Sequence, residues 1–325
     1  MKKLVIATLL AAATGLASAQ TVTTYGILDV NVTSSKTDGA GANTAMSENA
    51  LSTSRLGFIG AEDLGGGLKA EFQLESKLIP STGTVGANTS TSNTLFNRES
   101  WVGLNSTKFG AVRLGLTDVT DAVNIDATVT QIGELALATE LGTDKAKTVR
   151  YTTPTFAGFS AQVGYSNADA TTTTETTAGG VKAAFAKYEA GKLGAYVGYE
   201  SKKIDGSYDQ THKIVGAKYD LGIASVGAFY GVKDGATQAT ENTGEVKQTR
   251  ISAAVPLGNG FAAHAAYLKD KTSTQAATDY TGYKLAVTKS FSKRTTAYLA
   301  YLDTNYKSDA TADNKSTVVG VRHSF

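Results

Sequence analysis

Leu68-Lys69-Ala70-Glu71-Phe72-Gln73-Leu74-Glu75 is the stretch that decides the fold, because apolar and polar residues alternate along it without a break. Successive side chains of a β-strand point to opposite faces of the sheet, so Leu, Ala, Phe and Leu share one face here and Lys, Glu, Gln and Glu the other. The same two-residue period recurs over 159–166, 193–200 and 248–257. These apolar faces are too numerous for one small core, and the sequence predicts an all-β protein.

The connections between the strands alternate between short turns and long polar loops. The seven short turns lie near 63–67, 105–110, 154–158, 189–192, 220–222, 258–260 and 291–293. The eight loops lie near 34–51, 79–94, 118–146, 167–177, 205–209, 234–245, 270–279 and 307–314. Fifteen connections imply sixteen antiparallel strands with both termini on the short-turn side. That pattern is typical of a transmembrane antiparallel β-barrel of the outer membrane.

Composition excludes several other classes of protein. The chain of 325 residues has no cysteine, which rules out a disulfide scaffold and a thiolate metal site. Lys and Arg number 31 and Asp and Glu 29, and without Lys2 and Lys3 the balance is 29 against 29. A neutral chain gives no support for a nucleic-acid partner.

The first nineteen residues have the layout of an export signal. Lys2 and Lys3 precede an apolar run over 4–13, and Ala17-Ser18-Ala19 is a small-residue cleavage site. The apolar run is too short to span about 30 Å of hydrocarbon as a helix. We therefore predict a cleaved signal peptide over 1–19 and a barrel over 20–325.

A secreted β-sandwich is the main alternative fold, and three features weigh against it. Tyrosines recur near strand ends on the apolar phase, as in the aromatic girdles of barrels: Tyr165, Tyr199, Tyr219, Tyr230, Tyr267, Tyr283 and Tyr298. Charges occupy mid-strand positions of the lumen phase: Arg55, Lys69, Glu71, Arg113, Arg150, Arg250 and Arg322. The chain also ends in a strand whose last aromatic residue, Phe325, is in phase with Val319 and Val321. We expect this strand to close the barrel against the segment near Tyr25.

Several motifs resemble one known family. They are Thr24-Tyr25-Gly26-Ile27-Leu28-Asp29, Ser54-Arg55-Leu56-Gly57-Phe58, Phe96-Asn97-Arg98-Glu99, Val149-Arg150-Tyr151 and Gly320-Val321-Arg322-His323-Ser324-Phe325. Together they resemble the trimeric general porins of β-proteobacterial outer membranes. Leu116 and Ser324 stand where that family commonly has basic residues, and the long loop lacks a Pro-Glu-Phe-type segment.

The resemblance implies a sixteen-stranded barrel, three copies per assembly, and a water-filled pore narrowed by the third loop. The sequence supports an inward fold of that loop on its own. The loop over 118–146 is the longest and contains seven large aliphatic residues: Val123, Ile125, Val129, Ile132, Leu135, Leu137 and Leu141. A solvent-exposed loop of this kind would risk aggregation, so we expect it to pack against the inner wall. The alternatives are that it folds over the barrel mouth or onto a neighbouring subunit.

Three arginines are the expected basic side of the constriction. Arg55, Arg98 and Arg150 each follow an extracellular loop by a few residues, on alternate strands about 10 Å apart. The family places wall arginines at the matching positions. The third loop offers five carboxylates that could face them: Asp118, Asp121, Asp126, Glu134 and Glu140. Lys69, Glu71 and Arg113 are further lumen charges. Such charges would set up a transverse field, and we expect a mild anion preference. The arginines could instead only anchor the loop through salt bridges, and both roles are compatible.

No catalytic or metal site is indicated. His212, His264 and His323 lie on different predicted strands, and neither a zinc-protease nor a serine-hydrolase motif occurs. No cofactor or metal is therefore predicted. A barrel that acts as an enzyme or adhesin is the other functional class, but it would need a catalytic group, a plug or very long loops. We expect partners of four kinds: a homotrimer, outer-membrane lipids, small hydrophilic solutes and ions, and the barrel-insertion machinery acting on the C-terminal strand.

Overall fold

The computed structural model describes residues 21–86, 95–130, 146–167, 180–205, 208–235, 244–273, 279–307 and 313–325. The predicted signal peptide, 1–19, lies outside the described residues, so its cleavage stays a prediction. Almost every described element is a β-strand. No helix within the described ranges is long and apolar enough to cross a membrane.

Eighteen strands follow one another in the described residues. Those of the first half are β1 Thr21–Thr37, β2 Ala42–Glu48, β3 Arg55–Gly65, β4 Leu68–Ile79, β5 Thr84–Val85, β6 Glu99–Ser106, β7 Gly110–Thr117, β8 Ala146–Thr152 and β9 Phe159–Ser166. Those of the second half are β10 Val181–Ala190, β11 Leu193–Asp205, β12 Tyr208–Asp220, β13 Ser225–Asp234, β14 Val246–Gly258, β15 Phe261–Thr272, β16 Tyr280–Ser290, β17 Thr295–Tyr306 and β18 Asn314–Ser324. Within the described part of the connection from β7 to β8 lie two short helices, η1 Asp121–Asn124 and α2 Ile125–Thr130.

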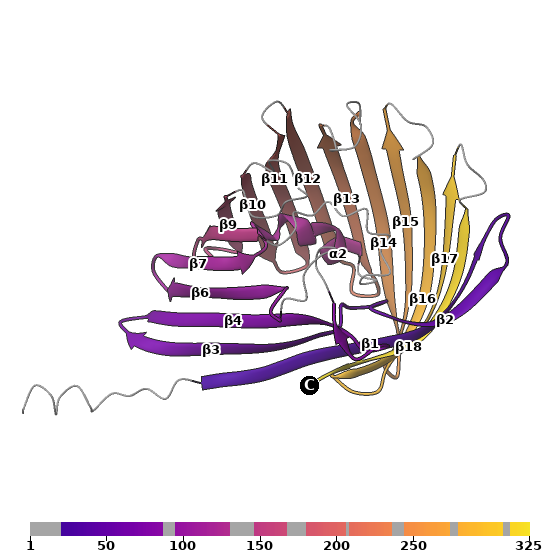
Figure 1. Ribbon diagram of the computed structural model, residues 1–325, viewed down its shortest axis with the longest axis horizontal. Helices are drawn as coiled ribbons and strands as arrows, with labels where there is room; N and C mark the ends of the chain where they lie inside the picture. Colours follow the sequence, from indigo (N-terminus) through magenta and orange to yellow (C-terminus); the bar gives the residue numbers. More distant parts are fainter. Residues whose placement is uncertain are drawn as a thin grey trace, which may run out of the picture.

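Sixteen of these strands form a closed antiparallel barrel, which confirms the predicted count (Figure 1). The other two, β2 and β5, belong to the first and second loops. The ring closes between β1 and β18, where Ile27 pairs with Ser324. Gly26 and Phe325 exchange backbone hydrogen bonds of 3.1 and 3.0 Å. An unpaired strand edge in hydrocarbon would leave polar backbone groups unsatisfied, so this seam is essential to the wall.

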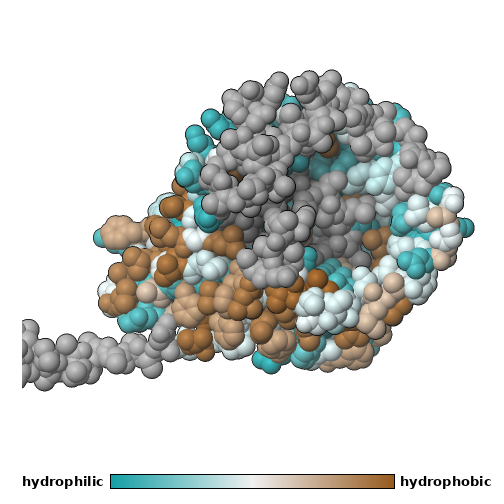
Figure 2. Space-filling model, in the orientation of Figure 1, coloured by the Kyte–Doolittle hydropathy of each residue, from teal (hydrophilic) through white to brown (hydrophobic). Residues whose placement is uncertain are grey.

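The two faces of the wall differ as the alternation predicts. Outward residues such as Val102, Val163 and Leu285 are 60%, 55% and 57% exposed, while their neighbours point into the lumen. Figure 2 shows apolar side chains gathered over the outer surface of β1, β3 and β4. Tyr298 is an exception to the girdle prediction, which was wrong at this position. It points inward, is 3% exposed and donates a hydrogen bond to Asp29.

The first loop also departs from expectation, because strand structure extends far into the predicted loop over 34–51. Strand β1 continues to Thr37, and β2 returns beside it with Val32 opposite Met46. The chain then leaves the wall over 49–54 and rejoins it at Arg55, the first residue of β3. The predicted loop was longer than the observed one, because its polar Ser, Thr and Asn residues pair in the hairpin of β1 and β2 instead of forming coil.

Candidate functional site: the lumen wall and its two inward segments

The third loop enters the lumen directly after β7. Residues 118–130, here called the loop 3 segment, cross the inner wall from β9 to β14. The Thr120 hydroxyl accepts a hydrogen bond from Ala122 N and caps η1, which α2 continues. Val119, Ile125 and Val129 are 0%, 1% and 0% exposed, so the aliphatic residues of this segment pack on the wall. The predicted inward fold is confirmed for this part, while Ile132, Leu135, Leu137 and Leu141 lie outside the described residues.

Glycines on adjacent strands form the seat of the loop 3 segment. A Cβ at Gly198 would lie 2.6 Å from Ala122 Cβ, and one at Gly216 would lie 2.6 Å from Ile125 Cγ2. The approach is closest at Gly227, where an added Cβ would collide with the carbonyl oxygen of Val129. That carbonyl also accepts a hydrogen bond of 2.6 Å from the Ser252 hydroxyl. The wall therefore admits this backbone only because it lacks side chains there.

Ion pairs hold both ends of the loop 3 segment. Arg150 Nη1 lies 3.1 Å from Asp121 Oδ1, and the Arg150 side chain is 6% exposed. Asp121 Oδ2 also accepts a hydrogen bond of 2.6 Å from Gln162. At the other end, Arg250 Nε lies 3.6 Å from Asp126 Oδ2, and Arg250 also pairs with Asp270. The Arg250 side chain is 0% exposed, so this cluster is a buried anchor.

A second inward segment comes from the first loop. Residues 49–54, here called the loop 1 segment, are held by the buried carboxylate of Asp29. Asp29 Oδ2 accepts hydrogen bonds from Leu51 N at 2.7 Å and Ser52 N at 2.8 Å, and Oδ1 accepts one from Tyr298. Leu51 packs against an apolar cluster that includes Leu268 and Val318 on the inner wall. The two inward segments thus cover different sectors of the wall.

One carboxylate, Glu75 on β4, joins two of the predicted constriction arginines. Arg98 Nε lies 2.6 Å from Glu75 Oε1, and Arg55 Nη1 lies 3.9 Å from the same atom. The Tyr25 hydroxyl donates a hydrogen bond of 2.8 Å to Glu75 Oε2. Arg55 Nε also donates a hydrogen bond of 2.9 Å to the Thr53 carbonyl, so the loop 1 segment orients this arginine.

The structure therefore brings Arg55 and Arg98 together and places Arg150 in a separate contact beneath the loop 3 segment. The Arg55 and Arg98 side chains are 23% and 18% exposed, which leaves both accessible from the lumen. Of the predicted acidic residues, Asp121 and Asp126 are anchors. Asp118 is partly buried, and its carbonyl accepts a hydrogen bond of 3.3 Å from Arg150. Glu134 and Glu140 lie outside the described residues.

The remaining predicted lumen charges share the wall sector from β3 to β7. The Arg113 guanidinium stacks over the Trp101 ring, 4.1 Å from its centroid. Glu71 accepts a hydrogen bond of 3.1 Å from Asn105, and Lys69 follows the same lumen phase on β4. Sequence reasoning missed Glu75 and Asp29. Glu75 is the last residue of the alternating stretch 68–75 and lies on its polar face, so the sequence contained a signal for it. No local pattern marks Asp29 as the acceptor for the backbone N–H groups of residues 51 and 52.

Comparison with known proteins fits this architecture. The family described as Gram-negative porin matches residues 7–309. The chain belongs to the Gram-negative porin family. This porin is 38% identical over 180 residues to outer membrane porin protein 32 of Delftia acidovorans, an alignment that covers 51% of the chain and 49% of the relative. The chain spans about half the length of the curated relatives it matches.

Solved structures extend the likeness to the whole barrel. An anion-selective porin from Comamonas acidovorans superposes with a TM-score of 0.77 at 25% identity, over 94% of this chain and 100% of that one. The trimer form of OmpT from Vibrio cholerae superposes with a TM-score of 0.66 at 15% identity, over 95% and 100%, and shows the fold alone. Family and fold together place this porin in the outer membrane of a Gram-negative bacterium.

Proposed function

We propose that this porin forms a water-filled channel for passive diffusion of ions and small hydrophilic solutes. Sixteen-stranded barrels of this size leave an aqueous channel rather than a filled core. The charged wall sector from β3 to β8 and the two inward segments give the lumen the polar lining that hydrated solutes need. An enzyme or adhesin is not favoured, since His212, His264 and His323 lie apart on β12, β15 and β18.

A mild anion preference is part of the proposal. The observation that carries it is the sharing of Glu75 by Arg55 and Arg98, because one carboxylate offsets only one of two permanent positive charges. Arg150 is already paired with Asp121 and should contribute less to the field in the lumen. This refines the predicted role of the three arginines, which we assign unequally to the constriction.

Reversal potentials in a KCl gradient across a planar bilayer test both statements. We expect channel currents and a modest Cl⁻ preference at pH 7 for the parent protein. Arg55→Ser and Arg98→Ser should each shift the reversal potential toward K⁺ selectivity, and Glu75→Gln should shift it the other way. Arg150→Ser is the matched control and should shift it least. A parent that prefers K⁺, or equal shifts in all three arginine variants, would contradict the assignment, whereas absence of conductance would contradict the channel itself.

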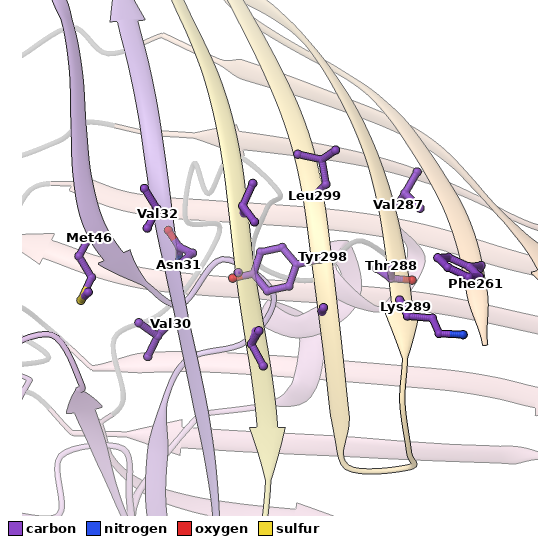
Figure 3. Close-up of a pocket in the computed structure, with 14 residues that line it drawn as sticks. Val30, Asn31, Val32, Met46, Phe261, Val287, Thr288, Lys289, Tyr298 and Leu299 are labelled. Carbon is purple, nitrogen blue, oxygen red and sulfur yellow. The ribbon is translucent and has the colours of Figure 1, made fainter. Parts of the chain in front are cut away.

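We further propose a homotrimer, as in the OmpT trimer form. The outer wall beside the barrel seam carries an apolar hollow of about 610 Å³ (Figure 3). Val30, Val32, Met46, Leu299 and Val319 line it, and they come from β1, β2, β17 and β18. The first strand's outward residues thus adjoin a concave apolar surface that a second copy of the chain could fill.

Light scattering of the protein in mild detergent tests the trimer, together with heat-dependent mobility in gels. The parent should run as a trimer that heat dissociates. Val32→Lys and Met46→Lys should yield folded monomers, whereas Val163→Lys, on the outer face of β9, should leave the trimer intact. A monomeric parent protein would overturn the proposal.

Export across the inner membrane and insertion into the outer membrane are also part of the proposal. The signal peptide over 1–19 would direct the chain across the inner membrane, and the strand ending in Phe325 would be recognised by the insertion machinery. The Phe325 ring covers Gly26 on the outer side of the seam, so its loss would also uncover β1. N-terminal sequencing of the mature protein should begin at Gln20.

A further inference from the structure

Tyr25 on β1 makes a contact that crosses a whole strand of the lumen wall. Tyr25, Gly57 and Glu75 are consecutive partners in the register of β1, β3 and β4, which lie side by side (Figure 1). Tyr25 and Glu75 are therefore two strands, or about 10 Å, apart along the wall. The Tyr25 hydroxyl nevertheless donates its hydrogen bond of 2.8 Å to Glu75 Oε2. The tyrosine side chain thus lies along the wall, across β3.

Gly57 leaves the space that this crossing needs. A Cβ at Gly57 would lie 2.5 Å from Tyr25 Cζ and 2.5 Å from the hydroxyl oxygen, which is closer than such atoms can approach. Gly57 is itself buried, as expected for a backbone that a ring covers. The absence of a side chain at this position therefore sets the path by which Tyr25 reaches β4.

A second side chain of β4 fixes the direction of the hydrogen bond. Gln73 Nε2 donates a hydrogen bond of 2.6 Å to the Tyr25 hydroxyl oxygen. An amide NH₂ group can only donate and a carboxylate can only accept, so the phenol proton is directed toward Glu75. The order of donors runs from Gln73 through Tyr25 to Glu75.

The two oxygens of Glu75 consequently have different partners. Oε1 lies 2.6 Å from Arg98 Nε and 3.9 Å from Arg55 Nη1, whereas Oε2 accepts the hydrogen bond from Tyr25. A carboxylate and an arginine frequently form a bidentate pair that uses both oxygens. Because Tyr25 holds Oε2, both arginines approach Glu75 through the same oxygen.

Burial separates this carboxylate from the two cations. The Glu75 side chain is 4% exposed, whereas the Arg55 and Arg98 side chains are partly accessible from the lumen. A solute therefore meets guanidinium groups before it meets the carboxylate. Glu99 is directly opposite Glu75 on β6, and like charges in such positions repel each other. The Tyr25 hydroxyl lies on the other side of β4, over Gly57, and draws Oε2 away from Glu99.

We propose that Tyr25 is a positioning residue for ion selectivity, which holds Glu75 against the wall so that Arg55 and Arg98 present their positive charge to permeating anions. The inference rests on the proposed channel and its anion preference. Without the hydroxyl, Oε2 is a buried acceptor that has lost its donor, and the carboxylate gains by turning toward the guanidinium groups. More of their charge is then neutralised at close range, and the field in the lumen is weaker.

Reversal potentials of Tyr25→Phe in a KCl gradient test the proposal. This substitution keeps the ring across Gly57 and removes only the hydroxyl, so the protein should fold as the parent does. We expect a shift toward K⁺ selectivity that is smaller than the shift caused by Arg55→Ser. Gly57→Ala displaces the ring by a different route and should shift the potential in the same direction. A folded Tyr25→Phe protein with the parental reversal potential would overturn the inference.

Tyr196→Phe is the matched control. The Tyr196 hydroxyl donates a hydrogen bond of 2.7 Å to the carboxylate of Glu189, which also pairs with Lys218. The control therefore removes the same group from a similar contact on β10 and β11, in another sector of the wall. Its reversal potential should equal that of the parent. A shift as large as that of Tyr25→Phe would show that the effect is not specific to Glu75 and its arginines.

A double-mutant cycle with Glu75→Gln distinguishes positioning from a merely structural role. If Tyr25 acts through the charge of Glu75, Tyr25→Phe should shift the reversal potential in the parent and not in the Glu75→Gln protein. Equal shifts in the two backgrounds would overturn the proposal. The same cycle on the thermal unfolding midpoint should also show coupling, because the hydrogen bond joins the two residues. Coupling in stability without any effect on selectivity would make Tyr25 a structural residue only.

The parent protein separates this inference from the proposed function. A parent that conducts but prefers K⁺ would contradict the anion preference alone, since the shift caused by Tyr25→Phe is measured relative to the parent. Absence of conductance in the parent would contradict the channel and, with it, the role of Tyr25. A conducting, anion-preferring parent whose selectivity is insensitive to Tyr25→Phe would contradict only the role of Tyr25.

Discussion

The loop 3 and loop 1 segments both fold into the lumen, but they are held by different chemistry. The loop 3 segment lies on a glycine seat and is fixed by ion pairs from Arg150 and Arg250. The loop 1 segment has no ion pair of its own among the described contacts and depends on hydrogen bonds to one buried carboxylate, Asp29. The difference teaches that a barrel lumen can be entered from two sides by segments that respond to different perturbations.

The largest effect should come from removing the buried cation of the loop 3 anchor. Arg250→Met removes the cation that pairs with both Asp126 and Asp270 and leaves Lys284 as the remaining cation described near Asp126, and breaking a buried pair in this way costs about 3–5 kcal/mol. We expect a lower thermal unfolding midpoint by circular dichroism and a larger single-channel conductance as the segment leaves the wall. Lys247→Met, on the outer face of the same strand, is the control. Unchanged conductance in a folded Arg250→Met protein would show that the ion pair does not hold the segment.

Removing the loop 1 anchor should have the next largest effect. Asp29→Ala leaves two backbone N–H groups and the Tyr298 hydroxyl without their acceptor, at about 1–3 kcal/mol for each group that stays buried. Conductance should rise, and anion preference should fall because Arg55 is oriented through Thr53. Tyr298→Phe removes only one of the three hydrogen bonds and should shift both readouts less. Identical behaviour of the two variants would argue against Asp29 as the anchor.

Filling the glycine seat should perturb the loop 3 segment alone. Gly227→Val sets a side chain against the Val129 carbonyl, and overpacking of this kind costs about 1–3 kcal/mol. Conductance should increase. In the double variant with Asp29→Ala, the change in selectivity should equal the sum of the changes in the two single variants, because the two segments lie on different sectors of the wall. Ala228→Val, which points outward from the next position, should behave like the parent. Strong non-additivity with Asp29→Ala would mean that the segments are coupled.

The smallest effect is expected from neutralising Asp126. Burial raises the pKa of this carboxyl, and Arg250 and Lys284 oppose that shift only in part. A carboxyl with a raised pKa binds more protons in the folded state, so its contribution to stability falls as the pH rises through that pKa. Asp126→Asn should therefore change the unfolding midpoint little at pH 4 and raise it slightly at pH 7. A large loss of stability at pH 7 would contradict this reasoning.

The fold was predictable from the sequence to a greater extent than the site. Alternation along 68–75 and the regular order of turns and loops depend on local chemistry, so the strand count followed from the residue pattern. The inward third loop followed from the family resemblance together with the aliphatic residues of that loop. The pairing of Arg98 with Glu75 depends on which strands become neighbours, and the Asp29 anchor depends on residues that leave the wall for only six positions. Tyr298 was wrongly assigned to the outer face of the wall, because apolar–polar alternation near a strand end does not determine which face a residue occupies when it has a buried hydrogen-bond partner, here Asp29.

The hydrogen bond from Ser252 to Val129 joins residues 123 positions apart. Contacts at such separation form late in folding, because the loop-closure entropy must be overcome first. The seat itself exists only after β9 to β14 have paired, so docking of the loop 3 segment follows assembly of that sheet. The bore therefore narrows only after the wall from β9 to β14 has formed. In the order of assembly, the loop 3 segment is an addition to a sheet that already exists.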